Sequence, residues 1–398
     1  MTNTDNNIKN PSQTRGFKIK INDIKNIILS SSTSTTIIFL GAPGIGKSYM
    51  VRMAAEEEAV RLGRKFVDFA TVSDELFSDI IQHPENYYIF IDLRLTRVEP
   101  TDLTGIPRTR ELRAGETVLR YAEYEPLKHS LVLSVPGIAG MLFLDELTNV
   151  QRLDLQALIF ELIWDRRLGD RVLSPLVRVV AAGNDPEFSA VASELPSPVI
   201  SRALVFRVEP PSVNEWISFM SSAYNEGEWT REIAAFLSRF PEYFIATSIP
   251  PSTLSPYPCP RSWTLLATTL PRMPRELWGA IVVAAVGEDV ARLFMTFLDK
   301  SAEVPPVEEI LKNPQVLKSL SLDALYLASL QLMQSFNIAD NRFITVFEVL
   351  VDVKRDVLVA TLLSLPPKRR EMVAVALSRS EKLRRIMLEM GSLLREVR

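Results

Sequence analysis

The sequence predicts an α/β fold in its first half, with a parallel sheet between helices, and an all-helical second half. Up to about residue 208, short apolar runs of strand character alternate with runs of helical periodicity. After Pro210 and Pro211 the strand-like runs stop. The glycine-rich stretch GAPGIGKS, residues 41–48, joins the first strand-like run to a helical one, which is the context of a phosphate-binding loop.

The first strand and its loop predict a nucleotide site. Residues 35–41, TTIIFLG, are β-branched and aromatic, which is typical of a buried parallel strand. In the loop, glycines let backbone N–H groups face a phosphate, Lys47 reaches the β- and γ-phosphates, and the Ser48 hydroxyl holds Mg²⁺. A surface turn that carries a lysine is the alternative interpretation. The predicted nucleotide-binding residues are Gly41, Pro43, Gly44, Ile45, Gly46, Lys47, Ser48 and Tyr49.

The remaining elements follow from the same periodicities. A short helix is expected at residues 21–31, before the first strand. Further strands are predicted at 87–95, 140–146, 177–184 and 203–209, and helices at 213–224, 231–240, 262–270 and 277–300. The expected domains are a disordered tail at 1–16, a nucleotide-binding core at 17–209, a helical unit at 210–300 and a helical C-terminal extension at 301–398, with residues 301–309 as a linker.

Composition excludes several classes of protein. The formal net charge of −3 gives no overall basic field for nucleic acid or an anionic membrane. A single cysteine, Cys259, allows no disulfide within the chain, and with His83 and His129 it cannot build a His/Cys zinc site. No apolar run has the length of a membrane span, and the N-terminus has no signal-peptide pattern. We therefore expect a cytoplasmic protein.

The tail from Lys368 onward is locally basic. It holds nine Lys and Arg residues against four Glu residues, so its charge is 9 − 4 = +5. A solvated helix face and a contact with an acidic partner or nucleic acid are both compatible with this pattern.

Two carboxylates end the strand predicted at residues 140–146. Asp145 and Glu146 follow a fully apolar run, and ligands bind at this end of the strands of an open α/β sheet. Asp145 can hold Mg²⁺ together with Ser48, and Glu146 can orient or deprotonate an attacking water. A strand end that enters an acidic helix cap is the alternative, but the loop upstream makes it improbable.

Three polar residues are further candidates for the site. Asn184 ends a core strand, where its amide can hydrogen-bond the γ-phosphate or the attacking water, although an ordinary turn asparagine fits as well. Arg202 stands at a helix-to-strand junction and Arg261 at the start of a helix. A guanidinium suits the charge that develops on a transferring phosphoryl group, whereas most arginines are simply surface residues.

The order of these motifs resembles the AAA+ ATPases and, within them, the MoxR family. The resemblance covers roughly residues 20–300 and rests on more than the glycine-rich loop. The matching stretches are VEPTDLTGIPR at 98–108, LFLDEL at 142–147, LQALIFELIWDRRLGDRVL at 155–173, VRVVAAGN at 177–184, LPSPVISRALVFRVEPPSVNEWISF at 195–219 and PRSW at 260–263.

The resemblance implies a role for each candidate residue. Asp145 and Glu146 would be the Walker B pair, Asn184 sensor 1, and Arg261 a sensor 2 that acts within its own subunit. Arg202 would be the arginine finger that reaches the nucleotide of the neighbouring subunit. Residues 210–300 would form the helical lid, residues 108–127 an insert within the second helix, and residues 166–173 a hairpin before sensor 1.

The chain departs from the family pattern at two places. The Walker B stretch reads DELTNV, with no arginine after it. The finger stands between Ser201 and Ala203, where the family usually has Asn or Asp before it and Phe after it.

The function implied by the resemblance is ATP hydrolysis with Mg²⁺ by a homo-oligomeric ring, by default a hexamer. Such a ring would remodel or load cofactor into a client protein in a chaperone-like way, and the client could carry a von Willebrand A domain. Two alternatives stay open: a nucleic-acid motor of the related helicase branch, and a nucleotide-dependent binding switch that rarely hydrolyses. The resemblance gives no role to residues 301–398.

Overall fold

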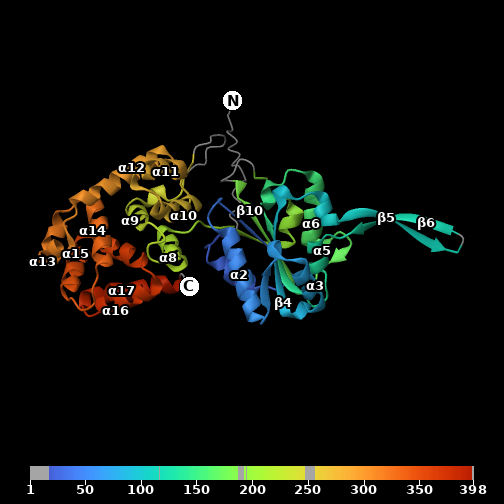
Figure 1. The fold of residues 1–398 in the computed structure, drawn as a ribbon, viewed down its shortest axis with the longest axis horizontal. Helices are drawn as coiled ribbons and strands as arrows, with labels where there is room; N and C mark the ends of the chain where they lie inside the picture. The colour runs from blue at the N-terminus through green and yellow to red at the C-terminus, as the bar shows by residue number, and fades with distance from the viewer. Residues whose placement is uncertain (1–17, 116, 187–191, 194, 247–255, 397–398) are drawn as a thin grey trace, which may run out of the picture. The chain divides into compact units, whose positions relative to one another are not determined.

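This computed structural model describes residues 18–115, 117–186, 192–193, 195–246 and 256–396 (Figure 1). The chain divides into two compact units between Pro210 and Pro211, and each is described by itself. The tail expected at residues 1–16 and most of the proline-rich loop at 248–261 lie outside the described residues.

The first unit is built on a seven-stranded parallel sheet with the order β1-β11-β2-β10-β7-β4-β3. Its strands are β1 Lys18–Ile19, β2 Thr36–Gly41, β3 Lys65–Asp68, β4 Tyr87–Arg94, β7 Ala139–Asp145, β10 Val177–Asn184 and β11 Ala203–Val208. All five strands predicted from the sequence are present. The two edge strands, β1 and β3, were missed because runs of two and four residues are too short to show a periodicity.

Both faces of the sheet are covered, which explains why its strands are apolar at nearly every position. Successive residues of β2 enter different cores: Ile37 and Phe39 pack with residues of α1 and α2, whereas Ile38 packs on the opposite face with residues of α6. The helices of this unit are α1 Asp23–Ser30, α2 Lys47–Arg61, α3 Asp74–Gln82, α4 Pro100–Thr104, α5 Lys128–Leu133, α6 Leu153–Asp165 and α7 Ser197–Ile200.

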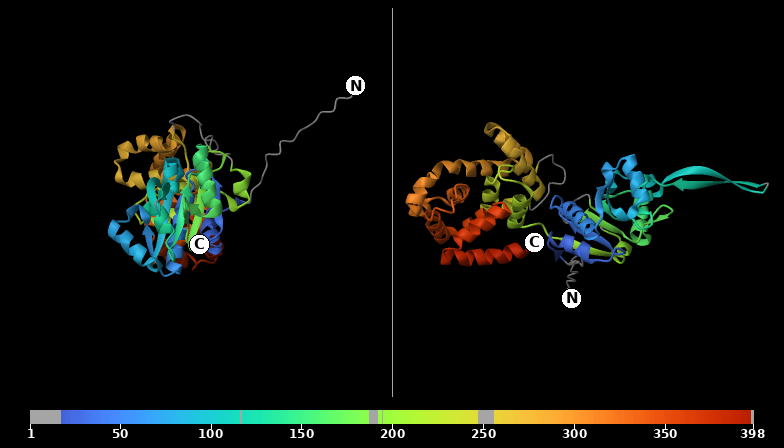
Figure 2. Two further views of the ribbon diagram at one scale, coloured as in Figure 1. Left: turned by 90° about the vertical axis from the view of Figure 1, so that its right-hand side faces the viewer. Right: turned by 60° about the horizontal axis from the view of Figure 1, so that its bottom comes forward.

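Two hairpins stand outside the sheet. The insert expected at residues 108–127 is a long antiparallel ribbon of β5 (Ile106–Ala114) and β6 (Thr117–Glu125), which follows α4 and projects away from the sheet (Figures 1 and 2). The short hairpin expected at 166–173 is confirmed as β8 (Arg167–Leu168) paired with β9 (Arg171–Val172).

The described part of the second unit is helical. Its helices are α8 Val213–Ala223, α9 Glu232–Arg239, α10 Pro260–Thr269, α11 Trp278–Val286, α12 Glu288–Asp299, α13 Val307–Lys312, α14 Leu322–Gln334, α15 Arg342–Leu363, α16 Pro367–Leu377 and α17 Glu381–Glu396. The helical run predicted at 277–300 consists of two helices, α11 and α12. Gly287 ends α11 and precedes α12. Its φ of 89° is a backbone conformation that residues with side chains rarely adopt.

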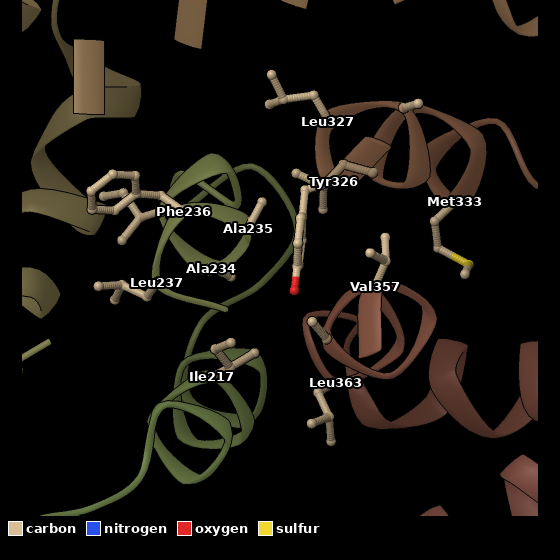
Figure 3. Packing of buried hydrophobic residues seen from close by; sticks show 14 of the residues in the cluster. Ile217, Ala234, Ala235, Phe236, Leu237, Tyr326, Leu327, Met333, Val357 and Leu363 are labelled. Atoms are coloured by element: carbon tan, nitrogen blue, oxygen red, sulfur yellow. The ribbon is translucent and has the colours of Figure 1, made fainter. Parts of the chain in front are cut away.

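One hydrophobic core extends through this unit from Trp216 to Ile386. In Figure 3, Phe236 and Leu237 of α9 and Ile217 of α8 lie in the same core as Tyr326 of α14 and Leu363 of α15. The segment expected as a linker contains a 3₁₀ helix at Lys300–Glu303 and the start of α13, and its Val304 and Val307 pack against the same core. Residues on both sides of position 300 therefore share one interior.

Among the described residues, no helix combines the length and the apolarity that a membrane crossing requires.

Candidate functional site

The glycine-rich loop connects the C-terminal end of β2 to the N-terminus of α2. Gly44 and Gly46 have φ of 75° and 104°, the left-handed region that glycine occupies without strain. A Cβ on Gly41 would lie 2.8 Å from the carbonyl oxygen of Val208 on the neighbouring strand. Ile45 is buried and anchors the loop in the core beneath it. The loop conformation thus depends on the glycines at these three positions.

Lys47 is the buried cation of the loop, with only 7% of its surface exposed. Its Nζ donates hydrogen bonds to the carbonyl oxygens of Gly41, at 2.9 Å, and Ala42, at 2.8 Å. The ammonium group therefore lies inside the turn of the loop, where α2 also begins. A helix N-terminus and a fixed ammonium group both favour a bound anion such as a phosphate.

The other predicted loop residues surround this position. Pro43 and Gly44 are half-buried, and Gly46 is exposed. Tyr49 lies on the first turn of α2 with 46% of its surface exposed.

Ser48 and Asp145 meet across two elements. The Ser48 hydroxyl, at the start of α2, donates a 2.9 Å hydrogen bond to Oδ2 of Asp145, at the end of β7. Asp145 Oδ1 accepts from the backbone N–H of Glu146, also at 2.9 Å, so the carboxylate is held at both oxygens. A hydroxyl and a carboxylate side by side are oxygen ligands of the kind Mg²⁺ takes, which fills its other positions with water and substrate phosphates.

Glu146 has an unusual backbone conformation beside this pair. Its φ of 62° lies in the left-handed region, which costs a non-glycine residue free energy and is concentrated at functional sites. Its carboxylate accepts a hydrogen bond from the hydroxyl of Thr96, which follows β4. Sequence analysis missed Thr96. The available signal was its place just after a core strand, since β4 pairs with β7 up to Arg94 and Asp145.

Asn184 ends β10 and lies opposite Gly41 in the pairing of β10 with β2. Thr148, a buried residue after β7, fixes its backbone at both groups: Thr148 Oγ1 accepts from Asn184 N at 2.8 Å and donates to Asn184 O at 3.0 Å. Gly183 leaves the space for this side chain, because a Cβ there would lie 2.8 Å from Thr148. Sequence analysis also missed Thr148.

A further carboxylate lies near the site. Asp92 belongs to the last residues of β4, which pairs with β7. Asp92 is exposed, and the pKa of its carboxyl is raised, first by desolvation from its neighbours and then by the negative charge of Asp145. Across the described residues, no three His, Cys, Asp or Glu side chains gather closely enough to form a protein-only metal cage.

Arg202 lies at the N-terminal ends of the strands, whereas this site lies at their C-terminal ends. It precedes β11, whose first residue, Ala203, pairs with Thr36 at the start of β2, whereas the glycine-rich loop begins five residues later at Gly41. Five residues of strand span roughly 17 Å. The exposed guanidinium of Arg202 stacks over the ring of Trp164, 4.2 Å from its centroid. Arg202 therefore does not join the site of its own chain.

Arg261 belongs to the second unit. It is exposed on the first turn of α10, next to the half-buried Cys259. The residues that the first unit brings to one edge of its sheet are the glycine-rich loop, Asp145, Glu146 and Asn184, as the parallel register requires.

Comparisons with known proteins add little to this geometry. No family model matches the chain, and no curated protein matches it. Among solved structures, the chain is similar to the Pyrococcus furiosus Hef helicase domain, with 12% identity and a TM-score of 0.23, over 85% of this chain and 69% of that one. A likeness this weak carries no argument about function, so the fold and the site rest on their own geometry.

Proposed function

We propose that this chain is a Mg²⁺-dependent ATPase of the AAA+ type that assembles into a ring and remodels a client protein, as the MoxR resemblance implies. The observation that carries the proposal is the 2.9 Å hydrogen bond between Ser48 and Asp145, beside the buried ammonium of Lys47. This bond joins the hydroxyl of the loop after β2 to the carboxylate at the end of β7, which is separated from β2 in the sheet by β10. A magnesium–nucleotide site requires such a pair.

Each residue of the site has a role in this proposal. The loop N–H groups and Lys47 bind the β- and γ-phosphates of ATP, and Ser48 and Asp145 hold Mg²⁺ and its waters. When bound, the metal neutralises charge on the transferring phosphoryl group. Glu146 orients the attacking water and accepts its proton, and Asn184 contacts the same water or the γ-phosphate.

Arg202 supports the assembly into a ring. Arg202 lies at the N-terminal ends of the strands, away from the glycine-rich loop of its own chain. In the proposed ring, its guanidinium reaches the nucleotide of an adjacent subunit instead. A cation supplied in this way stabilises the charge of the transition state. A hexamer is the ring size implied by the resemblance, and Arg261 would act from the helical unit as sensor 2.

The client is proposed to contact the β5–β6 ribbon. The ribbon exposes six large apolar side chains to solvent: Ile106, Leu112, Val118, Leu119, Tyr121 and Tyr124. A two-stranded ribbon with apolar groups in water gains stability from a partner that covers them. Replacement of Leu119 and Tyr121 by Ser should abolish stimulation of ATP hydrolysis by the client and keep the basal rate; an unchanged stimulation would contradict this contact.

The hydrolysis itself is tested with four proteins: the wild type, Lys47→Ala, Glu146→Gln and Arg202→Ala. We expect Mg²⁺-dependent ATP hydrolysis by the wild type, a residual rate about 10³-fold lower from Arg202→Ala, and no hydrolysis by Lys47→Ala or Glu146→Gln. Glu146→Gln should retain ATP and form six-subunit rings in mass photometry. Wild-type turnover no greater than that of Lys47→Ala would refute the ATPase.

Action between subunits is tested by mixing. Arg202→Ala has an intact hydrolytic site and Glu146→Gln has an intact finger; alone, the first keeps only its low residual rate and the second is inactive. A mixed ring places an intact finger against an intact site, so the mixture should regain hydrolysis. A mixture as inactive as its components would mean that Arg202 does not act in a neighbouring subunit.

A further inference from the structure

The guanidinium of Arg202 stacks on an aromatic face. Its carbon lies 4.2 Å from the centroid of the Trp164 ring, and Phe160 stacks with Trp164 at 6.2 Å and 24°. Within the described part of the chain, the guanidinium makes no hydrogen bond and no ion pair. Its five N–H donors therefore have no partner among the residues that the structure describes.

The tryptophan is held in place by the end of its helix. Trp164 lies on the last turn of α6, two residues before Arg166, which adopts φ of 53° and ends the helix. The guanidinium of Arg166 donates to the carbonyl oxygen of Thr33, at 2.9 Å, and to that of Val177. These contacts fix the end of α6 to the loop before β2 and to the start of β10.

Trp164 is not the residue that stability alone would select here. Its indole N–H is buried and has no partner in the described structure, and a buried donor without an acceptor destabilises a fold. Phenylalanine would fill much of the space without this cost. What tryptophan adds is the aromatic face that attracts a cation most strongly.

We propose that Trp164 is a positioning residue that holds the exposed Arg202 guanidinium against its ring, where it can meet the phosphates of the neighbouring subunit's nucleotide. This inference rests on the proposed role of Arg202 as a finger acting between subunits. A carboxylate partner would orient the guanidinium too, but it would neutralise the charge and occupy the donors. An aromatic face orients the group and leaves both free.

The first test compares Trp164→Phe, which keeps an aromatic face, with Trp164→Leu, which does not. The Leu variant should lower kcat about fivefold with an unchanged KM for ATP, and the Phe variant should recover most of the loss. The Phe variant should also unfold at no lower temperature than the wild type, because it removes the unpartnered N–H.

The same substitutions in an Arg202→Ala background separate positioning from a structural effect. If Trp164 acts through Arg202, Trp164→Leu has no further effect on kcat in that background. An equal fall in both backgrounds, or a Phe variant as slow as the Leu variant, would overturn the proposal.

A second measurement does not depend on activity. Trp164 is the one tryptophan of residues 1–210, and Trp164→Phe identifies its signal in the ¹⁹F spectrum of fluorotryptophan-labelled protein. We expect Arg202→Ala to shift this signal and Arg202→Lys to shift it less, whereas Arg261→Ala leaves it unchanged. An unshifted signal would show that the stacked pair does not exist in solution. A shifted signal with full turnover by Arg202→Ala would instead refute the finger, and the positioning role with it.

Discussion

At the scale of single residues, the site is fixed by short side chains that hold other groups in place. Thr96 binds the Glu146 carboxylate, and Thr148 binds both backbone groups of Asn184. Neither threonine belongs to a recognisable motif. Both follow the C-terminal end of a core strand, where the parallel sheet gathers its loops. The residues that position the site are thus the ones that are hardest to identify from the sequence.

Removal of the Thr148 hydroxyl should disturb Asn184. Thr148→Val keeps the shape but leaves the N–H of Asn184 without its acceptor, which costs about 1–3 kcal/mol when buried. We expect a lower free energy of unfolding and a lower kcat for ATP. Thr36→Val is the matched control: it removes a 3.3 Å hydrogen bond from another buried threonine, at the distant end of β2. Equal kcat values for the two variants would contradict a role for Thr148 in placing Asn184.

Asp92 should make the stability of the nucleotide-free protein depend on pH. The side chain of Asp92 is exposed, yet desolvation by its neighbours and then the charge of Asp145 disfavour the carboxylate and raise its folded-state pKa above the ordinary Asp value. Ionisation therefore costs folding free energy as pH rises through the folded pKa, and below the unfolded pKa there is no cost. Asp92→Asn should stabilise the protein near neutral pH and not in acid, as urea unfolding at the two pH values would measure. A gain that is the same at both values would exclude this cause.

At the scale of elements, a buried polar cluster joins α2 to the sheet. Glu58 of α2 accepts hydrogen bonds from Arg178 of β10, at 2.8 and 3.0 Å, and from the Tyr88 hydroxyl of β4, at 2.6 Å. Burial and the charge of Glu58 raise the pKa of Tyr88. Because α2 begins at the glycine-rich loop and β10 ends at Asn184, the cluster also aligns the two elements that carry the site.

Removing one charge of this cluster should lower the free energy of unfolding far more than replacing all three side chains by apolar ones. Glu58→Gln leaves the Arg178 charge buried and uncompensated, which costs about 3–5 kcal/mol. The triple variant Glu58→Leu, Arg178→Met and Tyr88→Phe should retain most of the stability. The ¹⁹F signal of Trp164 in fluorotryptophan-labelled protein, followed during urea unfolding, reports on this unit. A triple variant less stable than Glu58→Gln would show that the cluster is a net source of stability.

At the scale of the whole molecule, the two units differ in how their elements are packed together. The first is layered on a sheet, and its site depends on strand register. The second depends on one apolar interior to which residues on both sides of position 300 contribute. Helical periodicity predicts helices but gives no information about which helices share a core.

Truncation of a C-terminal core residue should therefore destabilise helices that precede position 300. Phe347 of α15 is fully buried, and Phe347→Ala should cost about 3–5 kcal/mol. The tryptophans of this unit, at positions 216, 229, 263 and 278, all precede position 300, so their fluorescence tests the coupling. Leu265→Ala, at a residue that is 61% exposed, is the control and should be neutral. An unchanged tryptophan transition in Phe347→Ala would mean that residues 301–398 fold independently.

The sequence by itself determined the α/β class, five core strands, the glycine-rich loop and the carboxylates after β7. These features are local: a buried strand needs a continuous apolar run, and the loop needs glycines at fixed spacing. Only the tertiary structure decided which separate segments meet. The contacts of Thr96 with Glu146, Thr148 with Asn184 and Trp164 with Arg202 join residues 50, 36 and 38 positions apart. Such contacts depend on which strands become neighbours in the sheet, and the local pattern of a single strand does not encode its neighbours.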